Sequence, residues 1–218
     1  MIDIKLLEHL ETFITAKRKA KFSKVLAQRT KHFTVATEDV YQLHNTSAVI
    51  RSCDVFGIQE VHIIEEQNSK QIDSEIAMGA QKWVDIKRHH SVKKAISNLK
   101  QTGYQIVATT PHEHNVVLSD FEVDKKSCFF FGKEIDGLSQ DVLNEADVFL
   151  KIPMVGFTES LNISVSAAII LQQLTAKLKA SEFPWQLSED ELVEKRLDWC
   201  KKTIKSYDEI VERFYKTN

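Results

Sequence analysis

Short apolar runs rich in β-branched and aromatic residues alternate along this chain with longer segments whose apolar residues recur every three or four positions. The first pattern predicts β-strands and the second predicts α-helices. Strands that alternate with helices are typical of an α/β fold, in which helices flank both faces of a mainly parallel sheet. We expect strands at residues 33–40, 61–65, 105–109, 128–131 and 148–152, and helices at residues 46–56, 91–101, 139–146 and 161–179.

Both ends of the chain are expected to be helical extensions of this α/β domain. Residues 1–31 combine an apolar stripe with a basic segment. Near the other end, Ser188 and Glu191 form a capping box, and apolar residues then recur at spacings of four and three as far as Phe214. These spacings predict one amphipathic helix of about 40 Å, which packs along its own domain or pairs with a second chain. The expected division is residues 1–31, 32–180 and 181–218.

The composition is that of a globular protein, with 43% hydrophobic residues, 28% charged residues and a net charge of −2. No apolar run approaches the ~20 residues that a membrane span needs, and the first residues lack the pattern of a signal peptide. Cys53, Cys128 and Cys200 are odd in number and far apart, which argues against a disulfide framework. We therefore expect a cytoplasmic protein with no membrane partner.

A basic segment precedes the central domain. Between residues 12 and 37 there is no Asp or Glu, whereas Lys and Arg occur at Lys17, Arg18, Lys19, Lys21, Lys24, Arg29 and Lys31. Such a segment is either a solvated helix face or a source of phosphate contacts. Its place just ahead of the first motif described below favours RNA.

Residues 132–138 and 152–162 gather small and turn-forming residues beyond predicted strands. The first segment has two glycines five positions apart, as a P-loop does, but Leu138 stands where a P-loop requires lysine. No G-x-G-x-x-G occurs, which argues against a dinucleotide site. In the second segment, either Ser160 or Asn162 is placed to cap the following helix.

Residues 44–57 predict a helix with Asn45 near its start and Arg51 about two turns later. Asp54, three positions after Arg51, is an obvious ion-pair partner. The alternative is a forked guanidinium that binds phosphate. Periodicity alone leaves both open.

Taken together and in this order, the three segments resemble the motifs of the TrmH (SpoU) family of the SPOUT class of RNA methyltransferases. The pattern is N-x-x-x-x-x-R-x-x-x-x-x-G, then G-x-E-x-x-G-L, then I-P-M-x-G-x-x-x-S-L-N-x-S, and the resemblance covers residues 21–179. It implies an α/β domain with a C-terminal deep trefoil knot, S-adenosylmethionine as cofactor, and a homodimer packed through the knot. The implied reaction is 2′-O-methylation of an RNA ribose.

The resemblance also implies functional residues, position by position. The catalytic set is Arg51, Asn45, Glu134, Ser160 and Asn162; the cofactor-binding set is Thr109, Gly132, Ile152 and Leu161; the RNA-binding set is Lys21, His44, Lys177 and Lys179. Arg51 is expected to assist the ribose 2′-hydroxyl, as a base helped by a substrate phosphate or as a phosphate clamp. No metal is expected, and His112 and His114 are interpreted as surface histidines.

Three features depart from the family. Lys21 stands where arginine is usual, and Ala176 and Leu178 stand where tRNA-modifying relatives carry a pair of arginines. The long C-terminal helix is not a core family feature. The expected substrate is guanosine 18 in the D-loop of tRNA. The alternatives are a ribosomal RNA methyltransferase of the same family and a non-catalytic RNA-binding module of the same fold.

Overall fold

The computed structural model describes residues 3–40, 42–66, 74–111, 116–134 and 136–217. The chain divides into two compact units, which are described separately. One is Thr30–Trp185, and the other combines Met1–Arg29 with Gln186–Asn218.

Within Thr30–Trp185, seven strands of the described residues form one sheet in which every pairing is parallel. Its order is β3-β2-β1-β6-β4-β7-β5. All residues of β1 and of β6 are buried, as expected for the centre of a parallel sheet covered on both faces. The strands are β1 (Phe33–Glu38), β2 (Glu60–Ile64), β3 (Asp85–His89), β4 (Gln105–Thr109), β5 (Val116–Val117), β6 (Ser127–Phe131) and β7 (Val148–Lys151).

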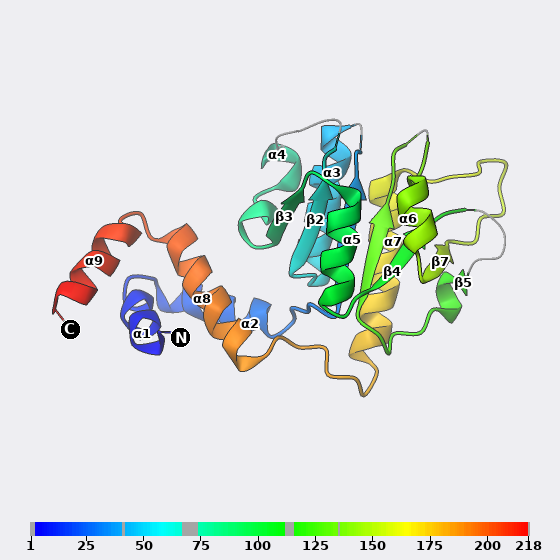
Figure 1. The fold of residues 1–218 in the computed structure, drawn as a ribbon. Coiled ribbons are helices and arrows are strands. Elements are labelled where there is room, and N and C mark those ends of the chain that lie inside the picture. The colour runs from blue at the N-terminus through cyan, green and yellow to red at the C-terminus, as the bar shows by residue number, and fades with distance from the viewer. Residues whose placement is uncertain (1–2, 41, 67–73, 112–115, 135, 218) are drawn as a thin grey trace. The chain divides into compact units, whose positions relative to one another are not determined.

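Helices cover both faces of this sheet (Figure 1). Helices α3 (Leu43–Phe56) and α7 (Ile163–Lys179) lie on one face, and α5 (Val92–Gln101) and α6 (Gln140–Glu145) lie on the other. Side chains alternate between two apolar cores along each strand, so Phe129 of β6 belongs to the α3–α7 core and Phe130 to the α5–α6 core. The short elements are α4 (Ser74–Ala77), η1 (Ala80–Lys82) and η2 (Leu118–Asp120).

The predicted α/β fold is confirmed, and the predicted strands and helices of the central domain all occur to within three residues. Strands β3 and β5 were not predicted. The sequence of β3 is Asp-Ile-Lys-Arg-His, which lacks an apolar run because β3 lies at the edge of the sheet. β5 has only two residues, too few to form a pattern.

The unit formed by the two chain ends contains α1 (Ile4–Glu11), α2 (Ala16–Leu26), α8 (Glu189–Thr203) and α9 (Tyr207–Thr217). Glu11 is buried and accepts a hydrogen bond from Nε of Arg196 at 2.7 Å, and it also pairs with Lys19. Opposite charges therefore join α1, α2 and α8. No helix among the described residues combines the length and apolar character needed to cross a membrane.

The expected single C-terminal helix is wrong. The capping box of Ser188 is present, but the helix ends at Ile204, whose backbone is extended, and α9 begins at Tyr207. The new direction lets α9 contact α1, because Tyr215 donates to Asp3 at 2.8 Å and the Phe214 ring lies 5.0 Å from that of His9. Tertiary contacts thus outweigh the local periodicity that predicted continuity.

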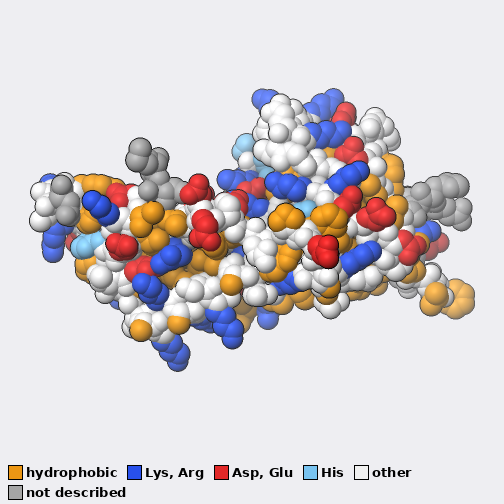
Figure 2. Space-filling view, turned by 90° about the horizontal axis from the view of Figure 1, so that it is seen from below, with side chains coloured by type: hydrophobic (Ala, Val, Ile, Leu, Met, Phe, Trp, Pro, Cys, Tyr) orange, Lys and Arg blue, Asp and Glu red, His pale blue; other side chains and the backbone are white. Residues whose placement is uncertain are grey.

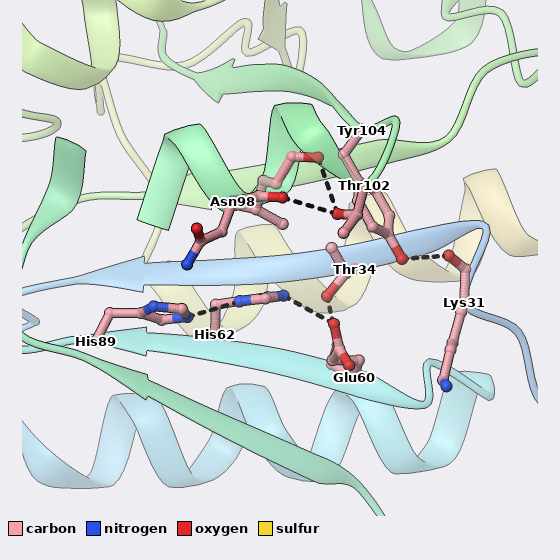
Figure 3. Close-up of polar contacts among 9 residues, drawn as sticks. Lys31, Thr34, Glu60, His62, His89, Asn98, Thr102 and Tyr104 are labelled. Atoms are coloured by element: carbon pink, nitrogen blue, oxygen red, sulfur yellow. Dashed lines mark hydrogen bonds and ion pairs between the residues drawn. The ribbon is translucent and has the colours of Figure 1, made fainter. Parts of the chain in front are cut away.

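A partly buried polar row, Glu60–His62–His89, crosses β2 and β3 beneath α5 (Figure 3). His62 is 6% exposed and lies between two partners: its Nε2 is 3.1 Å from Oε1 of Glu60, and its Nδ1 is 2.9 Å from Nε2 of His89. Of two facing ring nitrogens, one must donate and the other accept, so the pair cannot hold two imidazolium rings. Burial lowers the pKa of His89, and the charge of His62 lowers it further.

We predict that acidification destabilises the fold through this row. The pKa of His89 lies below its ordinary 6.5, so as pH falls through about 6.5 the unfolded chain takes up a proton that the folded chain does not. The free energy of unfolding, measured with urea, should therefore be lower at pH 5.5 than at pH 7.5. His32, whose pKa burial also lowers, acts in the same direction.

His89→Gln removes the titrating ring but keeps a hydrogen-bonding amide beside His62, so its loss of stability on acidification should be smaller than that of the wild type. The neighbouring exposed His90 provides the control variant His90→Gln. If His89→Gln and the wild type lose the same stability between the two pH values, the assignment to His89 is wrong.

Candidate functional site

The three segments singled out in the sequence meet through one chain of side-chain hydrogen bonds. Asn45, in the first turn of α3, donates through Nδ2 to Oε1 of Glu134 at 2.7 Å. Asn162 donates through Nδ2 to Oδ1 of Asn45 at 3.1 Å. The three residues come from segments far apart in the sequence, so the contact is a product of the fold.

The direction of these hydrogen bonds is fixed by chemistry. An ionised carboxylate only accepts, so the amide of Asn45 must turn its NH₂ toward Glu134 and its oxygen toward Asn162. Asn162 must then donate, and its own oxygen accepts from the backbone N–H of Ser164 at 2.8 Å and from the Ser164 hydroxyl at 2.6 Å. Both amides are therefore oriented by their neighbours, and Asn45, which is 2% exposed, is held in place.

Glu134 lies on a tight turn that follows β6. Lys133 and Gly137 exchange two backbone hydrogen bonds, of 2.8 and 3.0 Å, across this turn. A Cβ at Gly132 would lie 2.2 Å from the carbonyl carbon of Gly137, so only glycine permits this approach. The backbone N–H of Gln42 also donates to Oε1 of Glu134, at 3.2 Å. The glycines that resembled a P-loop thus serve backbone packing.

Residues 153–161 lie between β7 and α7 without regular structure. Asn162 is the N-cap of α7, which settles the choice between it and Ser160. In the described chain the backbone groups of residues 153–161 make no hydrogen bond, and Ser160 is exposed. Val155 and Phe157 are fully exposed, at 104% and 108%.

Arg51 is exposed on α3. Among the described residues, the guanidinium of Arg51 makes no hydrogen bond and no ion pair, so it does not pair with Asp54. Of the two interpretations drawn from the sequence, the structure favours a guanidinium available to a ligand. His44, also on α3, is exposed as well.

The remaining predicted residues are dispersed. The Thr109 hydroxyl donates to the carbonyl of Phe130 at 2.6 Å, which joins the ends of β4 and β6. Ile152 is partly buried just after β7, and Leu161 is 39% exposed. In α7, the ammonium of Lys177 donates to the Phe121 carbonyl at 2.7 Å. Lys179 lies 5.3 Å from the centre of the Trp185 ring.

Lys21 belongs to the unit formed by the chain ends and is exposed on α2. Lys and Arg side chains line the lower edge of this unit in Figure 2. His112 and His114 lie outside the described residues. Among those that are described, no group of three or more His, Cys, Asp or Glu side chains is arranged to hold a metal.

Two contacts of this site were missed in the sequence. The Gln42 backbone N–H gave no signal, because any residue other than proline offers this donor. Glu38 accepts from the backbone N–H of Ser139 at 2.9 Å. A lone acid at the end of an otherwise uncharged strand was the signal for Glu38.

Comparison with known proteins decides the family. Residues 32–172 match the model of the SpoU rRNA Methylase family, which is more than half of the chain. The chain belongs to the SpoU methylase family. The family that the motifs predicted is thereby confirmed.

Relatives match over most of the chain. It is 38% identical over 198 residues to the tRNA (guanosine(18)-2'-O)-methyltransferase of Borreliella burgdorferi, covering 91% of both proteins. It is 34% identical over 190 residues to the Thermus thermophilus protein of the same name, covering 86% of this chain and 98% of that protein. The TrmH/SpoU tRNA modifying enzyme of A. aeolicus has a TM-score of 0.78 and 30% identity, with 86% of this chain and 97% of that chain covered.

For this SpoU methylase we predict that Gly132→Ala disrupts the turn that carries Glu134. The added methyl group would overlap backbone atoms of Gly137, so a cost of about 1–3 kcal/mol or more in unfolding free energy is expected. Gly156→Ala is the matched control, because its Cβ would meet nothing closer than 3.9 Å. Thermal unfolding should show a lower Tm for Gly132→Ala only; equal Tm values would contradict the steric account.

Proposed function

We propose that this chain transfers a methyl group from S-adenosylmethionine to the ribose 2′-hydroxyl of guanosine 18 in the D-loop of tRNA. The observation that carries the proposal is the series of hydrogen bonds from Glu134 through Asn45 to Asn162, which joins all three family motifs. Asn45 lies on α3, which also presents Arg51, a residue that pairs with no described residue. The names of the relatives support the choice of tRNA and of guanosine 18.

The residues around the hydrogen bonds of Glu134, Asn45 and Asn162 fit the proposed cofactor. Residues 153–161 have backbone donors and acceptors that no described residue uses, and Leu161 and Ile152 offer apolar surface beside them. These two residues, with Gly132 and Thr109 at the ends of neighbouring strands, would hold the adenosyl group. When bound, the cofactor supplies an already activated methyl group, so the protein's tasks are to align the acceptor and to stabilise the 2′-oxygen.

Arg51 is the residue proposed to meet the reacting ribose. A guanidinium is effectively never deprotonated in proteins, so it acts here as a cation. It holds a substrate phosphate and stabilises the charge that develops on the 2′-oxygen. Asn45, Glu134 and Asn162 position the α3 and α7 ends around it, and the exposed hydroxyl of Ser160 contacts the substrate.

The proposed RNA contacts are unequal. Lys21 and His44 are exposed and can reach phosphates directly. Lys179 is also exposed, but its ammonium lies over the Trp185 ring and would have to leave it or share it. Lys177 already donates to a carbonyl group, so its contact with RNA would have to replace or share that bond. Leu178, one of the two positions where tRNA-modifying relatives carry arginine, is 1% exposed, so an arginine there would disturb the core.

A homodimer is part of the proposal. Phe157 and Val155 are fully exposed, and Val165 and Ile169 lie four positions apart on the outer side of α7, at 44% and 36% exposure. Large apolar side chains exposed at this level are typical of a protein interface when they form one patch. A second copy of the chain would cover them. Sedimentation equilibrium tests this: a dimer is expected, and a monomer at micromolar concentration would contradict it.

The cellular location follows from the same proposal. A tRNA substrate and the three buried, unbridged cysteines both fit the cytoplasm.

Methylation of unmodified tRNA in vitro, with the site mapped, tests the reaction. The wild type should methylate guanosine 18. Arg51→Ala should lower kcat by about a hundredfold or more, because the stabilising cation is lost. Its affinity for S-adenosylmethionine should stay within about twofold of wild type, since Arg51 lies outside the proposed adenosyl contacts. The kcat of Arg51→Lys, which keeps the charge but loses the forked guanidinium, should lie between that of the wild type and that of Arg51→Ala.

Each other outcome selects an alternative. Methylation of ribosomal RNA without methylation of tRNA would favour the ribosomal enzyme that the family description names. Cofactor binding without transfer to any RNA would favour a non-catalytic module. Near-normal turnover by Arg51→Ala would overturn the role of Arg51.

A further inference from the structure

Glu38 is a buried acid that none of the family motifs includes. It is the last residue of β1, is 2% exposed, and lies on the side of the sheet covered by α5 and α6. Burial of a carboxylate is costly unless hydrogen bonds replace its water. Its Oε2 accepts from the backbone N–H of Ser139 at 2.9 Å.

That contact fixes the far end of the turn that carries Glu134. The near end is fixed by β6, in which Phe131 pairs with Thr37 of β1, and by the close approach of Gly132 to Gly137. Ser139 is where the turn passes into α6, as the N-cap whose hydroxyl accepts from Val142. The same central strand therefore holds both ends of the turn.

The following residue, Asp39, makes a similar contact with the residue just beyond the end of β2. Its Oδ1 accepts from the backbone N–H of Glu66, just beyond β2, at 2.9 Å. Its φ of 44° is in the left-handed region, which is strained for any residue except glycine but is tolerated best by Asp and Asn. Here the chain leaves β1 toward α3, which carries Asn45 and Arg51.

We propose that Glu38 is a positioning residue for methyl transfer: its carboxylate fixes the turn at residues 132–139 so that Glu134 meets Asn45. Methyl transfer by this chain is the proposed function on which this inference rests. Glu38 does not touch substrate or cofactor. It acts through Glu134, which carries the only carboxylate in the hydrogen-bond chain of the three described motif residues.

The first test compares Glu38→Ala with Asp147→Ala. Asp147 is the control, because its carboxylate also accepts a backbone hydrogen bond, from Ile106 at 2.7 Å, but at the opposite end of the strands, where β4 and β7 begin. Asp147 is exposed whereas Glu38 is buried, so the control matches the hydrogen bond and not the burial. With saturating cofactor and tRNA, Glu38→Ala should lower kcat about tenfold, whereas Asp147→Ala should stay within about twofold of wild type. Equal kcat values for the two variants would overturn the proposal.

Glu38→Gln serves as the rescue, and it also keeps the test informative where Glu38→Ala folds poorly. The glutamine amide oxygen can still accept from Ser139, so Glu38→Gln should recover most of the lost kcat. A double variant tests the route: Glu38→Ala combined with Glu134→Gln should be no slower than Glu134→Gln alone. Multiplied losses, or a Glu38→Gln variant as slow as Glu38→Ala, would contradict action through Glu134.

Hydrogen exchange separates this inference from the proposed function, because it needs no activity. Amide exchange at Ser139 and Gly137 should be faster in Glu38→Ala than in Asp147→Ala. If the wild type methylates no RNA but exchange responds in this way, the proposed reaction fails while the role of Glu38 in the turn stands. If exchange is unchanged, the inference about Glu38 fails, whatever the activity.

Discussion

The site depends on one constraint: an ionised carboxylate can accept hydrogen bonds but cannot donate them. Glu134 therefore sets the direction of each bond in the chain, through Asn45 and Asn162 to the start of α7. Because every hydrogen bond in this series has a fixed direction, the side-chain amides of Asn45 and Asn162 can take only one orientation. The three motifs of this SpoU methylase are consequently joined to each other in one arrangement. Arg51, which pairs with no described residue, extends from the same helix as Asn45.

The parallel sheet brings these groups together. Strands β1 and β6 lie side by side at its centre, and the segments that leave parallel strands emerge at the same edge of a sheet. α3 comes after β1, the Glu134 turn comes after β6, and α7 returns from β7 to pack against α3. The close approach of Gly132 to Gly137 keeps the Glu134 turn compact. The tight turn and the strand order of the sheet thus both place the Glu134 carboxylate beside Asn45.

Much of this could be predicted from the sequence, because periodicity and turn residues are local signals. The central strands and their helices follow from such signals, and the cap of α7 was narrowed to Ser160 or Asn162. The ordered motifs identified the family. Their joint order mattered, since residues 132–138 alone looked like an incomplete P-loop. The P-loop likeness was misleading because those glycines permit backbone contact, which sequence spacing cannot distinguish from phosphate binding.

The features that the sequence could not supply depend on contacts between distant residues. The break between α8 and α9 follows from packing against α1, and β3 is a charged edge strand without an apolar pattern. Whether Arg51 pairs with Asp54 was open until both were placed. The knot that the resemblance implies stays a prediction, because threading is a property of the whole chain path and leaves no local pattern.

The most direct measurement exchanges donor and acceptor within the Asn45–Glu134 contact. Asn45→Asp places two carboxylates against each other and should lower the free energy of unfolding. Adding Glu134→Gln restores a donor opposite an acceptor, and the introduced aspartate can still accept from Asn162. The Gln42 N–H, which shares Oε1 of Glu134, then faces the glutamine NH₂, so the double variant should regain part of the loss. If the double variant is no more stable than Asn45→Asp alone, the contact does not join the motifs and the account of this site is wrong.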